Sequence, residues 1–67
     1  MVSTPADAFE AVSKRFDDSD VTSVYVKFRN NQRETIIRVR THSGTYFEMH
    51  QDASGTQTWS ELRLSQL

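Results

Sequence analysis

Residues 36–50, Ile-Ile-Arg-Val-Arg-Thr-His-Ser-Gly-Thr-Tyr-Phe-Glu-Met-His, are the stretch that decides the fold. Apolar residues alternate with polar ones on both sides of a short break at residues 42–44. Because successive side chains of a strand point to opposite faces, this period of two predicts two half-buried strands. A three-residue loop with Gly44 in the left-handed position of a bulge would join them as a hairpin.

The length of this loop determines which side chains share a face. A three-residue loop pairs residues of similar character: Thr41 with Thr45, Val39 with Phe47, and Ile37 with Met49. A two-residue loop would break these matches, because a slip of one residue moves every side chain to the other face. The same register places Arg38 opposite Glu48 and Arg40 opposite Tyr46, and such pairs contribute a few tenths to about 1 kcal/mol each.

An earlier segment adds a further strand to this hairpin. Residues 21–29 have the same alternation, with apolar side chains at Val24, Val26 and Phe28. The polar residues Asn30-Asn31-Gln32 separate this segment from the hairpin, and asparagine is common in turns because it tolerates a positive φ. The sequence therefore predicts a meander of at least three strands.

The last segment fits two different elements. After a loop at residues 52–55, a fourth strand would turn Leu62 and Leu64 toward the core. A short helix would instead start at a capping box formed by Thr58 and Glu61. The β-branched threonines and the position of Leu64 favour the strand.

The first twenty residues contain the signals of an amphipathic helix and its end. Thr4 is the expected N-cap, Pro5 the first helical residue and Asp7 the third position of a capping box. An apolar stripe has helical spacing and comprises Phe9, Val12 and Phe16, with Ala8 beside them. Residues 17–20, Asp-Asp-Ser-Asp, end the helix as a solvated connector or, in a second interpretation, form a weak cation site.

Together these segments predict one α+β domain over residues 1–67, with the element order α-β-β-β-β. The helix packs on one face of a three- to four-stranded antiparallel meander, and the last element is a strand or a helix. A chain of 67 residues buries only about 60% of its unfolded surface. The chain has no cysteine, which excludes disulfides and thiolate-bound metals, so we expect self-association to supplement the small core.

Composition and charge narrow the function classes further. The charged fraction is 25%, and no apolar run is long enough for a membrane span or signal peptide, so we expect a cytoplasmic protein. The net charge is −1, with carboxylates concentrated in residues 1–20 and cations in the predicted strands. His42 and His50 belong to no metal or catalytic motif. We therefore predict no catalytic residues, no metal, no cofactor and no small-molecule substrate.

The second face of the predicted sheet is the candidate functional surface, because one helix covers only one face. The partner-binding residues predicted on it are Tyr25, Lys27, Ile36, Arg38, Arg40, Tyr46, His50 and, if the last element is a strand, Trp59. Aromatic residues beside arginine favour a protein partner or a homodimer, with edge-strand pairing as a second route to the dimer. Single-stranded nucleic acid is the alternative partner, since bases stack on such rings. A face that is merely solvated remains a third interpretation.

Overall fold

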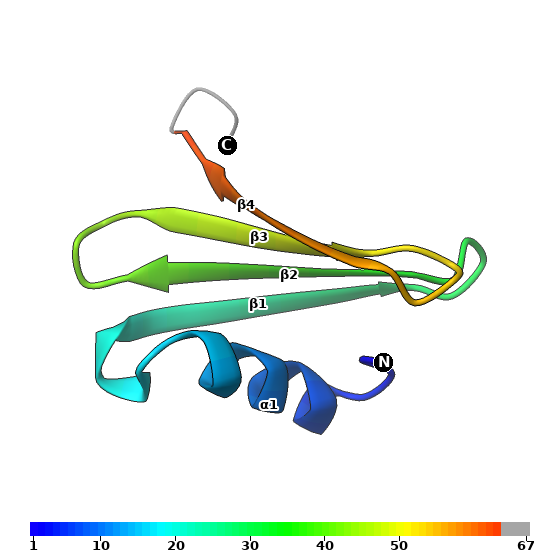
Figure 1. Cartoon of the computed structure of the whole chain (residues 1–67), viewed down its shortest axis with the longest axis horizontal. Coiled ribbons are helices and arrows are strands. Elements are labelled where there is room, and N and C mark those ends of the chain that lie inside the picture. Colours follow the sequence, from blue (N-terminus) through cyan, green and yellow to red (C-terminus); the bar gives the residue numbers. More distant parts are fainter. Residues whose placement is uncertain (64–67) are drawn as a thin grey trace.

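The computed structural model describes residues 1–63 and contains one helix and one sheet (Figure 1). The elements are α1 (Pro5–Arg15), the 3-10 turn η1 (Asp18–Asp20), β1 (Val21–Arg29), β2 (Glu34–Thr41), β3 (Tyr46–Gln51) and β4 (Gln57–Leu62). The strands form one antiparallel sheet in the order β1-β2-β3-β4. The predicted α+β fold is confirmed, and the segment left open by the sequence is a strand as far as Leu62. Within residues 1–63, no helix is long and apolar enough to cross a membrane.

The start of α1 is the capping box that the sequence predicts. The Thr4 hydroxyl accepts a hydrogen bond from the Asp7 amide at 3.2 Å, and the Asp7 carboxylate accepts one from the Thr4 amide at 3.2 Å. The helix ends at Arg15, and Phe16 is already extended, with φ −125° and ψ 149°. Asp17 then caps η1 by accepting a hydrogen bond from the Ser19 amide.

The apolar stripe of α1 differs from the predicted one at Phe9. Ala8 and Val12 are buried, whereas 56% of Phe9 is exposed. Helical residues follow one another by about 100°, so Phe9 lies on the flank of a stripe centred on Ala8 and Val12. The prediction that Phe9 faces the sheet is therefore wrong, and Phe16 completes the stripe from the end of the helix.

The β2–β3 hairpin has the predicted register. Its pairs include Ile37 with Met49, Val39 with Phe47, Arg38 with Glu48, and Arg40 with Tyr46. The Thr41 amide donates to the Thr45 carbonyl at 3.0 Å, which closes the three-residue loop. Gly44 has a φ of +84°, the left-handed conformation that the loop requires of it.

The core lies where α1 meets the middle of the sheet. Ile37 and Val39 of β2 and Met49 of β3 are fully buried and form one cluster with Ala8 and Val12. The apolar residues of β1 pack against this cluster but stay only partly buried: Val24, Val26 and Phe28. β1 therefore lies at the border of the core.

The segment before α1 is fixed by a buried glutamine. Gln51 at the end of β3 accepts a hydrogen bond from the Val2 amide at 2.8 Å and donates one to the Val2 carbonyl at 2.9 Å. Thr35 donates to the same carbonyl at 3.4 Å, and Gln57 donates to the Gln51 side chain at 3.0 Å. Val2, Thr35 and Gln51 are all buried, so this network closes one end of the core with its polar groups paired.

Candidate functional site

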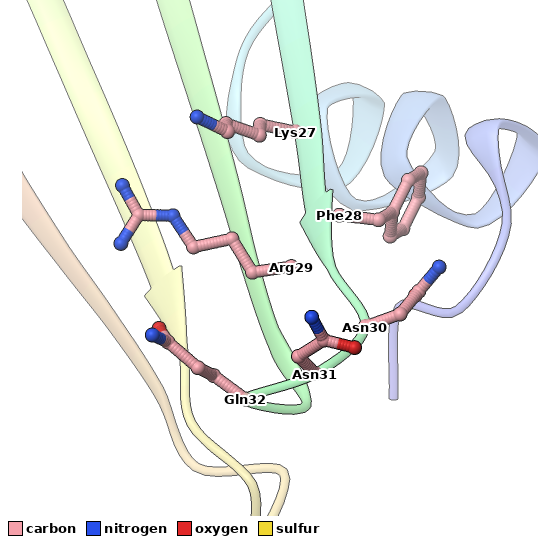
Figure 2. A pocket seen from close by; sticks show the side chains of 6 residues that line it. All are labelled: Lys27, Phe28, Arg29, Asn30, Asn31 and Gln32. Carbon is pink, nitrogen blue, oxygen red and sulfur yellow. The ribbon is translucent and has the colours of Figure 1, made fainter.

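The register of the strands divides the sheet into a core face and an open face. Residues directly opposite each other in an antiparallel ladder share a face. The open face carries Ser23, Tyr25, Lys27 and Arg29 from β1, Glu34, Ile36, Arg38 and Arg40 from β2, Tyr46, Glu48 and His50 from β3, and Thr58, Ser60 and Leu62 from β4. Figure 2 shows this alternation on β1, where Phe28 extends toward α1 while Lys27 and Arg29 extend to the other side. Within residues 1–63, no segment covers the open face.

The structure places seven of the eight predicted partner-binding residues on the open face: Tyr25, Lys27, Ile36, Arg38, Arg40, Tyr46 and His50. Their exposure differs. Tyr25 is 55% exposed, whereas Ile36 and Tyr46 are half-buried between neighbouring strands. The face therefore presents one protruding ring beside partly buried apolar surface.

Trp59 is the exception, and its predicted placement on this face is wrong. It lies opposite Met49 in the ladder and therefore on the core face. Its ring meets the Phe16 ring edge-on, with 5.7 Å between centroids, and the Arg15 guanidinium lies 4.9 Å from its centroid. Trp59 thus extends the core toward the edge of the sheet, beside the end of α1.

The β3–β4 loop explains this error. Gln51 pairs with Gln57 across the loop of residues 52–56, so Trp59 and Glu61 follow Gln57 onto the core face. Leu62 is predicted to face the core but lies opposite Tyr46 on the open face. The corresponding prediction for Leu64 falls outside the residues that the structure describes.

Specific contacts connect the side chains of the open face across strands. The Arg38 guanidinium donates to the Glu48 carboxylate at 3.0 Å, and the Arg40 guanidinium lies 5.7 Å from the centroid of the Tyr46 ring. Both contacts follow from the predicted register. They hold the side chains of β2 and β3 in place across the middle of the face.

Glu34 is a residue of this face that the sequence reasoning did not identify. Its carboxylate lies 2.7 Å from the His50 ring nitrogen Nε2, in a diagonal contact between β2 and β3. The sequence feature that could have identified Glu34 is its position two residues before Ile36, because residues two apart on a strand lie on the same face.

The open face has an excess of positive charge. It carries four cations, Lys27, Arg29, Arg38 and Arg40, against the carboxylates of Glu34 and Glu48. Both carboxylates are already engaged, with His50 and Arg38 respectively. The carboxylates of α1 lie in the helix layer, and those of η1 lie at one end of the sheet, directly before β1. The sheet therefore offers a basic surface although the whole chain has a net charge of −1.

A shallow hollow lies beside Tyr25. It encloses about 270 Å³ and is lined by Ser23, Tyr25, Arg38, Val39, Arg40 and Tyr46. This volume is below the range of about 300–1,000 Å³ that is usual for small-molecule sites. It suits one inserted side chain better than a whole ligand.

A larger hollow of about 510 Å³ lies at the β1–β2 turn, lined by residues 27–32. Figure 2 shows that its side chains diverge, with Phe28 and Asn30 on the side of α1 and Lys27 and Arg29 on the side of the open face. Polar groups that converge on one point are the usual mark of a catalytic or ligand site, and this arrangement lacks them.

Clusters of potential metal ligands are missing from the described part of the chain, in which no three His, Asp or Glu side chains are close enough to hold an ion. The acidic segment at residues 17–20 instead bonds to nearby polar groups. Asp17 accepts from the Ser19 amide at 3.2 Å, and Asp18 accepts from the Ser13 hydroxyl at 3.0 Å. These contacts fit the interpretation of a solvated connector.

Comparisons of the chain with protein-family models, with curated proteins and with solved structures give no match.

Proposed function

We propose that this domain is a non-catalytic protein-binding module and that the open face is its binding surface. The observation that carries the proposal is the position of Tyr25, which is 55% exposed on a face that no described segment covers. Arg38 and Arg40 lie opposite Tyr25 and Ser23 on the next strand, and both line the hollow at Tyr25. Exposed tyrosine and arginine around an apolar hollow are typical of interface hot spots.

The contacts within the face support its use as an interface. Arg38 is held by Glu48, and Arg40 is held over Tyr46, so these long side chains lose less freedom when a partner binds. The positive excess of the face favours a partner segment that carries carboxylates. A side chain from the partner would enter the hollow while its acidic groups meet Lys27, Arg29 and Arg40.

Single-stranded nucleic acid is the second candidate partner, and the same positive excess favours it. Two tyrosine rings, Tyr25 and Tyr46, lie on the open face near four cations. Bases stack on such rings while phosphates meet arginine and lysine. The position of Trp59 on the core face removes the third ring of the predicted stacking platform, and this makes a protein partner the better-supported function.

Site-specific photocrosslinking in the native cell tests the proposal. A photoreactive phenylalanine analogue replaces Tyr46 on the open face, and the control carries it at Lys14, an exposed position of α1. We expect distinct protein adducts at position 46, none of them at position 14, and their loss when Arg38→Ala is added. Equal adducts at both positions would overturn the proposal.

A binding assay separates the two candidate partners. Labelled single-stranded oligonucleotides of mixed sequence are titrated at low salt, where attraction to phosphate is greatest. We expect no change in fluorescence polarisation up to tens of micromolar protein. Tight binding that weakens steeply with salt, and that Arg38→Ala reduces more than Lys14→Ala, would replace the protein partner with nucleic acid.

A further inference from the structure

The outer edge of β1 is a long strand edge without a partner in the described chain. β1 spans Val21–Arg29 and is the first strand of the sheet, so β2 pairs with only one of its edges. The main-chain hydrogen bonds of turns, loops and caps within residues 1–63 involve none of residues 22–28. An edge of this length, with no proline, is a template for a further strand.

Apolar surface lies beside this edge. The core-face residues Val24, Val26 and Phe28 are only partly buried, because β1 lies at the border of the core. On α1, Phe9 lies on the flank of the buried stripe of Ala8 and Val12, and 56% of it is exposed. A strand added at the edge would cover part of this apolar surface.

The distribution of charge over residues 17–29 indicates which strand would pair with this edge. The turn before β1 carries Asp17, Asp18 and Asp20, and the end of β1 carries Lys27 and Arg29. The two ends of this segment therefore have opposite charge. An identical strand that runs antiparallel brings the acidic start of each copy beside the basic end of the other, which satisfies both at once.

We propose that β1 pairs with β1 of a second copy of this chain, antiparallel, with the two-fold axis at Tyr25. Tyr25 then lies opposite Tyr25 of the partner and Ser23 opposite Lys27 on the open face, while Val24 lies opposite Val26 on the core face. In this register no two like charges lie directly opposite each other. Lysine on an edge strand often prevents such pairing, but Lys27 faces Ser23 here and not another cation. The regular stretch begins at Ser23, because the bulge between Val21 and Ser23 interrupts the alternation before it.

This pairing joins two sheets into one of eight strands with a continuous open face. Both α1 helices lie on the same side, because all paired residues keep their faces. The two Tyr25 rings then occupy the centre of a basic surface of twice the area. The dimer does not depend on the proposed binding function. Its test changes residues of β1 and η1, whereas the test of the binding function changes Arg38 and Tyr46, so the two proposals can fail separately.

Single-cysteine variants test the register, since the chain contains no cysteine. Directly opposite residues have Cα atoms about 4.5–5.5 Å apart, within the range of a disulfide, whereas Ser23 and its copy would be about 14 Å apart. Under mild oxidation, we expect Tyr25→Cys to form a covalent dimer and Ser23→Cys to stay monomeric. A mixture of Ser23→Cys and Lys27→Cys should give the heterodimer. Crosslinking of Tyr25→Cys no faster than Ser23→Cys would overturn the proposal.

Sedimentation of the unmodified chain tests the dimer itself. The mass should rise with concentration from 7.7 kDa toward twice that value. Arg29→Glu should weaken association about tenfold at low salt, and adding Asp20→Lys should restore it, because the charges are exchanged in both copies. A mass of 7.7 kDa at every concentration would contradict the pairing, as would equal association of Arg29→Glu and the double variant.

Discussion

Gln51 binds both main-chain polar groups of Val2, accepting from its amide at 2.8 Å and donating to its carbonyl at 2.9 Å. The two residues are 49 positions apart in sequence, yet the side-chain amide pairs with Val2 as a neighbouring strand would. This contact connects the segment before α1 to the end of β3. It fixes the segment before α1 against the end of the core by hydrogen bonds.

Replacing Gln51 with alanine tests this connection. Gln51→Ala removes the partner of the buried Val2 amide and leaves the Val2 carbonyl with only the 3.4 Å bond from Thr35, so we expect the free energy of unfolding to fall by about 2 kcal/mol. Gln57→Ala is the control, because it removes one hydrogen bond from an exposed residue and should cost less than about 1 kcal/mol. Urea denaturation of both variants gives the comparison. Equal losses would show that Val2 is not fixed through Gln51.

A second prediction concerns the two aromatic residues whose positions the sequence assigned wrongly. Trp59 is partly buried against Phe16, so Trp59→Ala should lower the free energy of unfolding by about 2 kcal/mol, less than a fully buried tryptophan would. Phe9 is 56% exposed, and Phe9→Ala should change it by no more than about 0.5 kcal/mol. The measurement is denaturation at a concentration below that of self-association. The reverse order of the two effects would contradict the core described above.

The β2–β3 hairpin could be predicted because its information is local. A three-residue loop with a glycine at one position fixes the register, and the register fixes the face of every residue from Ile37 to Met49. The pairs Arg38–Glu48 and Arg40–Tyr46 follow from the same reasoning, so most of the open face was identified from sequence. The capping box at Thr4 is local in the same sense.

The β3–β4 connection carries the same local signal, which the sequence reasoning did not use. Residues 52–56 repeat the Ser-Gly-Thr pattern of residues 41–45: the Asp52 amide donates to the Thr56 carbonyl at 3.1 Å, and Gly55 has a φ of +88°. A three-residue loop here pairs Gln51 with Gln57 and places Trp59 on the core face. The contact of Trp59 with Phe16 joins distant segments, and periodicity alone carries no information about it. The Gln51–Val2 contact was missed for this second reason.

Two turn positions predict opposite effects of glycine. Arg33 has a φ of +54°, a conformation that costs an ordinary residue about 1–2 kcal/mol. Arg33→Gly relieves this strain, but glycine also gives the unfolded chain more conformational freedom. The free energy of unfolding should therefore rise by about 0.5 kcal/mol. Gly44 has a φ of +84° with no atom within 4 Å of an added Cβ, so Gly44→Ala introduces only backbone strain and should lower it by about 1 kcal/mol. Thermal unfolding checks both signs. A stabilising Gly44→Ala would show that this loop relaxes out of the left-handed conformation.

The capping box predicts a loss of stability in acid. Hydrogen bonds from the Ser3 amide, followed by the Thr4 and Ser3 hydroxyl groups, lower the pKa of Asp7 below its ordinary value of 3.8. A carboxylate whose folded-state pKa is lowered stabilises the fold above the unfolded-state value, and the contribution disappears as pH falls through the folded-state pKa. We therefore expect the free energy of unfolding to decrease as the pH falls below about 3.8.

Asp52 contributes in the same window, since a hydrogen bond from the Ser54 hydroxyl is the main cause that lowers its pKa. Asp7→Asn should therefore remove part of the acid dependence, and adding Asp52→Asn should remove more of it, because neither side chain then titrates. Urea denaturation between pH 2.5 and 6 compares the wild type with both variants. An acid dependence that persists undiminished in the double variant would mean that carboxylates outside these two turns control the loss of stability.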